Sequence, residues 1–263
     1  MSSKQRFSVG VDVGTECVKA IVVNAGGDVV GRAVVATRGY FQACVHEVLA
    51  AALDDAQVAE SDLAGVCATG FAASCVTQAT MTATETTCHA IGAFRHHPKA
   101  MTVINIGGRD PRVIHVDDHG QRTESLTVRR CAVGIGTFLM FTARHLDVHP
   151  TRLQELAAGA DHPAPISSFC SVFSGSEILE RLREGASREA VALGCIHSIA
   201  ERILEMGGFT APLVVTGGVP EYFPGVLRAL EAQSGMTVSV VPQPLFAGAL
   251  GAALKVVNGA AAA

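Results

Sequence analysis

An apolar strand pattern that ends in a glycine turn occurs at the start of the chain and again in its middle. The first copy is Phe7–Val13, which leads into the turn Asp12-Val13-Gly14-Thr15. The second copy is the run 101–106, which breaks at Gly107-Gly108-Arg109-Asp110. Each copy continues into further strands joined by tight turns, which predicts a β-meander. The repeat therefore predicts two lobes that share a cleft.

Helical spacing alternates with these strands. Residues 41–58 have the apolar period of a helix and are followed by a buried strand at 63–70. A long helix is expected at 187–206, and a strand at 212–216 precedes a helix at 223–234. Strands followed by crossover helices are typical of α/β folds. We therefore expect an α/β protein.

Composition narrows the class of protein. The chain has 263 residues, of which 49% are hydrophobic and 17% are charged, so it can bury a sizeable core. Its net charge of −4 supplies no basic field that would favour a nucleic acid or an anionic membrane as partner. The first residues carry no signal-peptide pattern, so secretion is not expected, and no apolar run approaches the roughly 20 residues of a membrane helix. Eight cysteines are then expected to be reduced thiols or metal ligands in a cytoplasmic protein.

Two of the cysteines precede helical patterns. Cys131 opens CAVGIGTFLMFTARHL, and Cys170 opens CSVFSGSEILERL. Helix N-termini favour negative charge, and thiolates are the usual ligands of iron–sulfur clusters, so this layout predicts that both cysteines face one anionic cluster. A cluster normally takes four cysteines, and a second chain would have to supply the other pair in a dimer. A bridging zinc ion is the alternative that the residues leave open.

Three glycine turns end three apolar strands. They are Asp12 to Thr15, Gly107 to Asp110, and Thr216-Gly217-Gly218-Val219. Glycine lets backbone N–H groups close around phosphate oxygens, and an acid at the strand end can hold Mg²⁺ through water. Neither a GxxxxGK[ST] motif nor a GxGxxG motif is present, so a P-loop or a Rossmann site is not expected.

The chain resembles a known family in segments that span nearly its whole length. In their order and spacing, the glycine turns resemble the two-lobed sugar kinase, Hsp70 and actin ATPase fold, which is ribonuclease H-like. More narrowly, the chain resembles the activators of 2-hydroxyacyl-CoA dehydratases and the ATPase subunits of benzoyl-CoA reductase. The matching stretches are GVDVGTECVKAIVV, CATGFAAS, ETTCHAIGA, VINIGGRD, CAVGIGTFL, SSFCSVFSGSEI, VVTGGVPEY and PLFAGALGAAL.

The resemblance implies a division into lobes. Residues 1–95 would form an N-terminal ATPase lobe, which a C-terminal helix at 246–257 completes. Residues 96–245 would form a second lobe that carries the two helices after the cysteines. Each lobe would contain one copy of the β-meander, and the nucleotide would bind in the cleft between the lobes.

The resemblance also implies roles for individual residues. Cys131 and Cys170 would hold half of a [4Fe–4S] cluster shared by two chains. Asp12, Asn105 and Asp110 would be catalytic, and Asp12 would organise Mg²⁺ and water. The residues expected to bind ATP are Gly14, Thr15 and Lys19 in the first phosphate turn, Gly107, Gly108 and Arg109 in the second, and Gly217 and Gly218 at the adenosine.

The activity that the resemblance implies is an ATP-dependent transfer of one low-potential electron. The acceptor would be a (R)-2-hydroxyacyl-CoA dehydratase, the electron donor a ferredoxin or flavodoxin, and the active form an oxygen-sensitive homodimer. The alternative is the ATPase subunit of a benzoyl-CoA-reductase-type complex, paired with a related subunit. Two alternatives of other classes remain: a sugar or acid kinase, and a nucleotide-switched scaffold without turnover.

The second phosphate turn departs from the family pattern. It usually reads Asp-Ile-Gly-Gly-Gln-Asp, whereas this chain has Asn105 at the first position and Arg109 at the fifth. Asn105 cannot act as a carboxylate base, and Arg109 would place a cation near the phosphates. Either Asn105 marks the weaker half of a heterodimer, or Asp12 suffices and Asn105 positions water.

The other cysteines and the histidines are expected to have structural roles. We expect packing or helix capping for the Cys88-His89 pair. The ten histidines include no H-x-E or H-E-x-x-H spacing, so an independent zinc enzyme is not expected. The cysteines interpreted as small core residues are Cys17, Cys67, Cys75 and Cys195.

Overall fold

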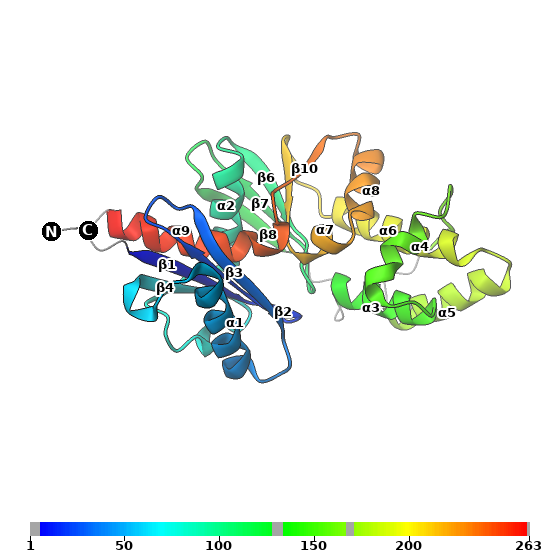
Figure 1. The fold of residues 1–263 in the computed structure, drawn as a ribbon. Helices are drawn as coiled ribbons and strands as arrows, with labels where there is room; N and C mark the ends of the chain where they lie inside the picture. The colour runs from blue at the N-terminus through cyan, green and yellow to red at the C-terminus, as the bar shows by residue number, and fades with distance from the viewer. Residues whose placement is uncertain (1–5, 128–133, 167–170, 262–263) are drawn as a thin grey trace. The chain divides into compact units, whose positions relative to one another are not determined.

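The computed structural model describes residues 6–127, 134–166 and 171–261. Within these ranges the chain forms two five-stranded sheets with helices packed against them (Figure 1). Contacts between residues define two compact units. Unit 1 comprises Met1–Ala100, Ile114–Glu124 and Val241–Ala263, and unit 2 comprises Met101–Val113 and Ser125–Val240.

The first sheet has the strand order β3-β2-β1-β4-β5. β1 pairs antiparallel with β2, and β2 pairs antiparallel with β3, so the expected meander is present. β4 lies on the other side of β1 and runs parallel to it. The strands are β1 (Phe7–Val13), β2 (Cys17–Val23), β3 (Val29–Ala36), β4 (Leu63–Gly70) and β5 (Met81–Thr82).

The two faces of this sheet bury different helices. Alternate side chains of a strand point to opposite faces. Val9, Val11 and Val13 of β1 pack in the cluster that contains helix α1 (Phe41–Ala56). Ile21 and Val23 of β2 instead pack against helix α9 (Ala247–Ala261). Asp12 and Lys19 stand next to α1-side residues along their strands, so their own side chains belong to the opposite face, which α9 covers.

Helix α2 (Glu85–His96) packs against α9 in unit 1 (Figure 1). It begins after Thr84, whose side-chain oxygen accepts a hydrogen bond from Thr87 N, as N-cap residues do. The alternative that the Cys88-His89 pair caps the helix is therefore wrong, because Thr84 already supplies the cap before the first helical turn. Cys88 and His89 lie after the first turn of α2 and are buried, which confirms the expectation that they pack.

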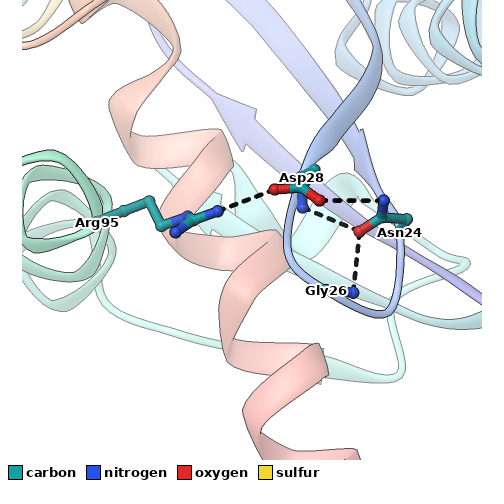
Figure 2. A network of polar contacts seen from close by, with 4 residues as sticks. All are labelled: Asn24, Gly26, Asp28 and Arg95. Atoms are coloured by element: carbon teal, nitrogen blue, oxygen red, sulfur yellow. Dashed lines mark hydrogen bonds and ion pairs between the residues drawn. The ribbon is translucent and has the colours of Figure 1, made fainter.

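The last turn of α2 is tied to the turn between β2 and β3 (Figure 2). Asn24 Oδ1 accepts hydrogen bonds from the backbone N–H groups of Gly26 and Asp28, which closes an Asx-type turn. Arg95 of α2 then reaches Asp28 Oδ1 at 3.0 Å. The pair is exposed to solvent, so it orients the helix end more than it stabilises the fold.

The second sheet has the strand order β10-β9-β6-β7-β8. Within unit 2, β6 and β9 run parallel and pair as far as Asn105 with Thr216, so their carboxyl ends lie at the same edge. β10 extends the pairing in parallel on the other side of β9. The strands are β6 (Met101–Asn105), β7 (Arg112–Val116), β8 (Arg122–Thr127), β9 (Leu213–Thr216) and β10 (Val238–Val240).

Helices surround β6 and β9 in unit 2 and form a large apolar core with them. Ile104, Leu139, Ile178 and Ile196 are fully buried there. The helix expected at 223–234 is confirmed as α8, which begins two residues later, after Phe223 and Pro224, whereas the short helix α7 before it was not expected. The helices are α3 (Ile135–His145), α4 (Leu153–Ala157), α5 (Ser171–Arg183), α6 (Arg188–Leu204), α7 (Gly218–Tyr222) and α8 (Gly225–Ser234).

The cysteines assigned to the core divide into two groups. Cys67 and Cys195 are fully buried, as expected, and burial raises the pKa of Cys195 to about 12. Cys17 and Cys75 are only partly buried, which corrects the expectation for these two. Cys17 begins β2 directly after a turn, and Cys75 ends a short 3-10 turn that packs against the edge of the core on the α1 side.

No helix among the described residues is both long enough and apolar enough to cross a membrane.

Candidate functional site

The first phosphate turn contains a buried ion pair. Asp12 on β1 and Lys19 on β2 are direct cross-strand partners, so the hairpin register places their side chains next to each other. Lys19 Nζ lies 2.8 Å from Asp12 Oδ2, and the two residues are 8% and 5% exposed. Two buried charges remain ionised only when they are paired, and this pair satisfies that condition.

The electrostatics of Lys19 follow from this pairing. Burial alone would lower the pKa of the Lys19 ammonium, but the carboxylate of Asp12, with smaller contributions from Cys17 and Glu85, more than offsets it, and the net pKa is raised above the ordinary 10.5. Lys19 is therefore a cation at neutral pH. Its Nζ also donates to the carbonyl of Cys17 at 3.3 Å, which directs the ammonium toward the turn.

The turn that joins the two strands is tight. Gly14 N donates to Cys17 O at 3.1 Å, and Thr37 Oγ1 donates to Gly14 O at 2.9 Å. A Cβ at Gly14 would lie 2.9 Å from Cys17 O and 3.0 Å from Lys19 Nζ, so only glycine fits beside the lysine. Thr15, the next residue, is partly exposed. These residues bring a cation, a small turn and a hydroxyl together, which suits phosphate oxygens.

The second phosphate turn, in unit 2, is built from backbone contacts. It follows Asn105, which ends β6 and is 2% exposed. The turn lies against the start of α3: Gly136 N donates to Gly108 O at 3.1 Å, and Ile135 N donates to Arg109 O at 3.3 Å. A Cβ at Gly134 would lie 2.5 Å from Gly108 O. The second phosphate turn and the N-terminus of α3 therefore form one packed unit.

The expected adenosine turn lies at the same sheet edge. Gly217 has φ +105°, and a Cβ there would lie 2.4 Å from Ile106 O and 2.7 Å from Asn105 Oδ1. Val219 N donates to Ile106 O at 3.0 Å, which fixes the start of α7 on the end of β6. Gly218 is the first residue of α7 rather than part of an open turn. Asn105, Gly217 and Gly218 are thus brought together with the second phosphate turn.

The structure groups the predicted nucleotide residues in two sets, one in each unit. Asp12, Gly14, Thr15 and Lys19 form the set in unit 1. The set in unit 2 consists of Asn105, Gly107, Gly108, Arg109, Asp110, Gly217 and Gly218. Arg109 is exposed and Asp110 is partly buried, whereas Asn105 is inside. The roles of all these residues in binding or catalysis stay predictions.

The two predicted cluster ligands, Cys131 and Cys170, lie outside the described residues. Their helices are described: α3 begins at Ile135 and α5 begins at Ser171, so each helix starts within a few residues of its cysteine. Among the described residues, no three His, Cys, Asp or Glu side chains are grouped so that they could hold a metal ion. A Mg²⁺ ion at Asp12 would therefore need phosphate oxygens and water as its other ligands, which is usual for this ion.

Two residues that reasoning from the sequence left without a functional role, His89 and Gly248, lie near Asp12, and a third, Glu85, acts on Lys19. Glu85 and His89 are one helical turn apart on α2, and the charge of Glu85 acts on Lys19. A Cβ at Gly248 of α9 would lie 3.0 Å from His89 Nε2 and 3.1 Å from Asp12 Oδ2. The i, i+4 spacing of Glu85 and His89 was the available signal, but nothing in the sequence connects it to Asp12.

Comparison with protein families decides the class. The model of the BadF/BadG/BcrA/BcrD ATPase family matches residues 9–256. The chain belongs to this ATPase family. A match over this range includes both phosphate turns, the adenosine turn and the two cysteine-headed helices.

Individual relatives are similar over nearly the full chain. The activator of lactoyl-CoA dehydratase from Anaerotignum propionicum is 35% identical over 94% of this chain and 96% of that activator. The crystal structure of component A of (R)-2-hydroxyglutaryl-CoA dehydratase from Acidaminococcus fermentans is 34% identical, with a TM-score of 0.91, and covers 97% of this chain and 99% of that one. The activator of 2-hydroxyisocaproyl-CoA dehydratase from Clostridium difficile, solved with bound ADPNP, has a TM-score of 0.89 at 29% identity and covers 97% and 96% of the two chains.

More distant similarities bear on the fold and on the alternatives. A benzoyl-CoA reductase subunit from Thauera aromatica is 29% identical over 94% of this chain and 92% of its own length. A ROK family glucokinase from Streptomyces griseus has a TM-score of 0.60 at 15% identity, covers 95% of this chain and 98% of that one, and bears on the fold alone. The predicted α/β fold of the actin-like ATPase type is confirmed.

Proposed function

We propose that this protein is an ATP-driven activator that delivers one low-potential electron to a (R)-2-hydroxyacyl-CoA dehydratase. The observation that carries the proposal is the similarity to dehydratase activators over nearly the whole chain, with a TM-score of 0.91 to one of them. The ATPase half is supported by membership of the family and by the activator solved with ADPNP.

The first phosphate turn would bind the nucleotide through its charges. Lys19 is a cation at neutral pH in a small space beside Gly14, and a phosphate oxygen can replace part of its interaction with Asp12. Asp12 would then accept hydrogen bonds from water in the shell of Mg²⁺ or orient the attacking water. Both roles use the carboxylate oxygens that lie beside the Lys19 ammonium.

The second phosphate turn would couple the nucleotide to α3. Gly108 O and Arg109 O accept hydrogen bonds from the first residues of this helix, so a change in the turn must move the helix start or break these bonds. A nucleotide can shift such an equilibrium only by binding one arrangement more tightly than the other. ATP and ADP differ in the phosphate that this turn would contact, and this difference could supply the preference.

Cys131 and Cys170 would hold the redox group. Each precedes a helix, and helix N-termini stabilise a negatively charged ligand. One chain offers two such thiols and a [4Fe–4S] cluster takes four, so two chains would share it. Bound there, the cluster would supply a reversible one-electron couple, which a ferredoxin or flavodoxin reduces and the dehydratase oxidises.

The test is anaerobic purification followed by iron, zinc and acid-labile sulfide analysis, with an EPR spectrum after dithionite reduction. We expect about four irons per two chains in the wild type and loss of iron in both Cys131→Ser and Cys170→Ser. Cys75→Ser is the matched control, because Cys75 is a partly exposed thiol far from α3 and α5 in sequence, and it should keep the iron. Bound zinc, or iron that survives either substitution, would contradict the shared cluster. Metal-free protein that transfers phosphate from ATP to a sugar or acid would replace the proposal with a kinase.

A second candidate is the ATPase subunit of a benzoyl-CoA-reductase-type complex. Asn105 favours it, because a chain that lacks the usual acid could work beside a related subunit that keeps it. The mass of the protein expressed alone separates the two candidates. A stable homodimer that hydrolyses ATP supports the activator, and a monomer without turnover supports the subunit.

A further inference from the structure

Helices α2 and α9 approach each other closely because glycines line their contact. A Cβ at Gly251 would lie 1.8 Å from Cys88 O, and a Cβ at Gly92 would lie 2.1 Å from Ala247 O. Both contacts are with backbone atoms, which cannot move aside without shifting a helix. The two glycines therefore fix where α2 lies on α9, and hence which of its side chains reach the sheet.

The side chains that reach the sheet are polar. His89 is 3% exposed, and its Nε2 faces the same small space above Gly248 as Asp12 Oδ2. On its other side, Asp12 Oδ1 lies against Gly70, where a Cβ would be only 2.4 Å away. The carboxylate is thus held between the backbone at Gly70 and the groups near Gly248.

The charges around this space are consistent with a role for α2. Burial lowers the pKa of Lys19 and Asp12 raises it, and Glu85, one turn before His89, adds the smallest contribution in the same direction as Asp12. Residues four apart on a helix share a face, so Glu85 and His89 lie on the same face of α2, and His89 is the one that reaches the space beside Asp12. A histidine buried only for packing would not need Asp12 as a neighbour, since burying a polar ring beside a carboxylate costs free energy unless the two interact.

We propose that His89 is a positioning residue, which sets the orientation of the Asp12 carboxylate at the first phosphate turn. The proposal rests on the proposed function, in which Asp12 orients water or a hydrated Mg²⁺ ion. The imidazole does not contact the substrate. The imidazole of His89 restricts the Asp12 carboxylate to one orientation. In that orientation one carboxylate oxygen stays paired with Lys19 and the other is directed at the first phosphate turn.

Gly248→Ala tests this without removing His89. The three atoms nearest to the added methyl group would be His89 Nε2 and the Oδ2 and Cγ of Asp12, all in side chains, so the substitution should displace these two side chains first. Gly259→Ala is the matched control, because Gly259 lies in the same helix and a Cβ there meets nothing within 4 Å. We expect Gly248→Ala to lower kcat for ATP hydrolysis about 10-fold or more, since small misplacements of catalytic groups cost about this much, with KM changed less than about twofold. Gly259→Ala should keep the wild-type kcat.

His89→Leu and His89→Gln complete the test. Leucine fills the space without a polar atom, and we expect a loss of kcat of about 10-fold or more. The glutamine amide nitrogen can reach the same region as Nε2, and we expect it to restore kcat to within about threefold of the wild type. Phosphate release, KM for ATP and thermal unfolding are measured on all variants.

The outcomes separate the two proposals. No phosphate release from the wild type would overturn the proposed ATPase and this inference with it. Release from the wild type combined with unchanged kcat in His89→Leu, or equal values for Gly248→Ala and Gly259→Ala, would overturn only the role of His89. Equal loss in the leucine and glutamine variants, in proportion to lowered thermal stability, would assign His89 to packing and also overturn the inference.

Discussion

The first phosphate turn and the second phosphate turn come from the same strand-and-glycine pattern, but they are held together by different forces. In unit 1, Asp12 and Lys19 form a buried ion pair on the sheet face that α9 covers. In unit 2, the corresponding position is the neutral Asn105, and the turn is fixed by backbone hydrogen bonds and by glycines at close contacts.

The difference teaches that each turn is sensitive to a different kind of change. A site made from a buried ion pair fails when one charge is removed, because the other charge is left in the interior. A site made from close backbone approach fails when a Cβ is added, because no side chain can move to accommodate it. Loss of charge should therefore affect the first turn alone, whereas an added Cβ should affect both turns, because Gly14 also lies close to a backbone oxygen.

The largest effect is expected from Asp12→Asn. The substitution leaves Lys19 buried without its carboxylate, and breaking such a pair costs about 3–5 kcal/mol of unfolding free energy. Loss of the carboxylate should also lower the rate of ATP hydrolysis by about 10²-fold to 10⁴-fold. Urea unfolding measures the first effect, and phosphate release measures the second.

The double variant Asp12→Asn with Lys19→Met is the control for stability. It removes both charges, so most of the lost unfolding free energy should return while hydrolysis stays low. If Asp12→Asn is as stable as the wild type, the ion pair does not support the first turn, and the contrast with unit 2 fails.

A smaller effect is expected from Gly217→Ala in unit 2. The residue has φ +105°, and its Cβ would lie 2.4 Å from Ile106 O, so strain and overpacking together should lower the unfolding free energy by about 2–4 kcal/mol. Weaker ADP binding, measured by calorimetry, should accompany the loss.

Gly235→Ala separates the two causes. Gly235 also has a positive φ, +68°, but a Cβ there meets nothing within 4 Å, so only conformational strain of about 1 kcal/mol is expected. Equal losses in the two alanine variants would show that the contact with β6 contributes nothing beyond the backbone conformation.

The parts of the fold that the sequence predicted are those with local signals. The β1–β2–β3 meander follows from alternating apolar residues separated by glycine turns, and the first turn places Asp12 and Lys19 near each other for the same reason. β5 has only two residues, and β8 reads RTESLT with mostly exposed side chains, so neither has an apolar pattern to detect. Helix α7 was not predicted, because its five residues begin at a glycine turn and are too few to show a helical period.

The candidate site was predictable only where sequence neighbours form it. The glycine turns could be found because each lies at the end of its own strand. His89 could not be connected to Asp12, because the contact depends on Gly248 in a helix from the other end of the chain and on the close packing of α2 against α9. Tertiary contacts of this kind have no periodic signature. The cysteines were the strongest signal in the sequence, but they lie outside the described residues, so their role rests on the family resemblance.

The smallest expected effect is a pH dependence of the unfolding free energy, which should come from the first turn and not from the second. The pKa of Lys19 is raised in the folded protein, so the folded state holds this proton more tightly than the unfolded chain does. The resulting stability is fully present below the ordinary lysine pKa of 10.5 and is lost as the pH rises through the folded value above it. The unfolding free energy of the wild type should therefore fall above pH 10.5, by at most about 1.4 kcal/mol per pH unit from this residue.

The matched measurement compares the wild type with the Asp12→Asn, Lys19→Met double variant by urea unfolding between about pH 8 and pH 11.5. Burial also raises the pKa of Cys17 above 9.0, which gives a loss in the same direction from a lower pH, so both proteins should carry Cys17→Ala. Lysines and tyrosines elsewhere titrate in both proteins, and their contributions cancel in the difference. A difference that stays constant across this range would mean that Lys19 has the same proton affinity in the folded and unfolded chain. The first turn would then depend on shape alone, as the second does.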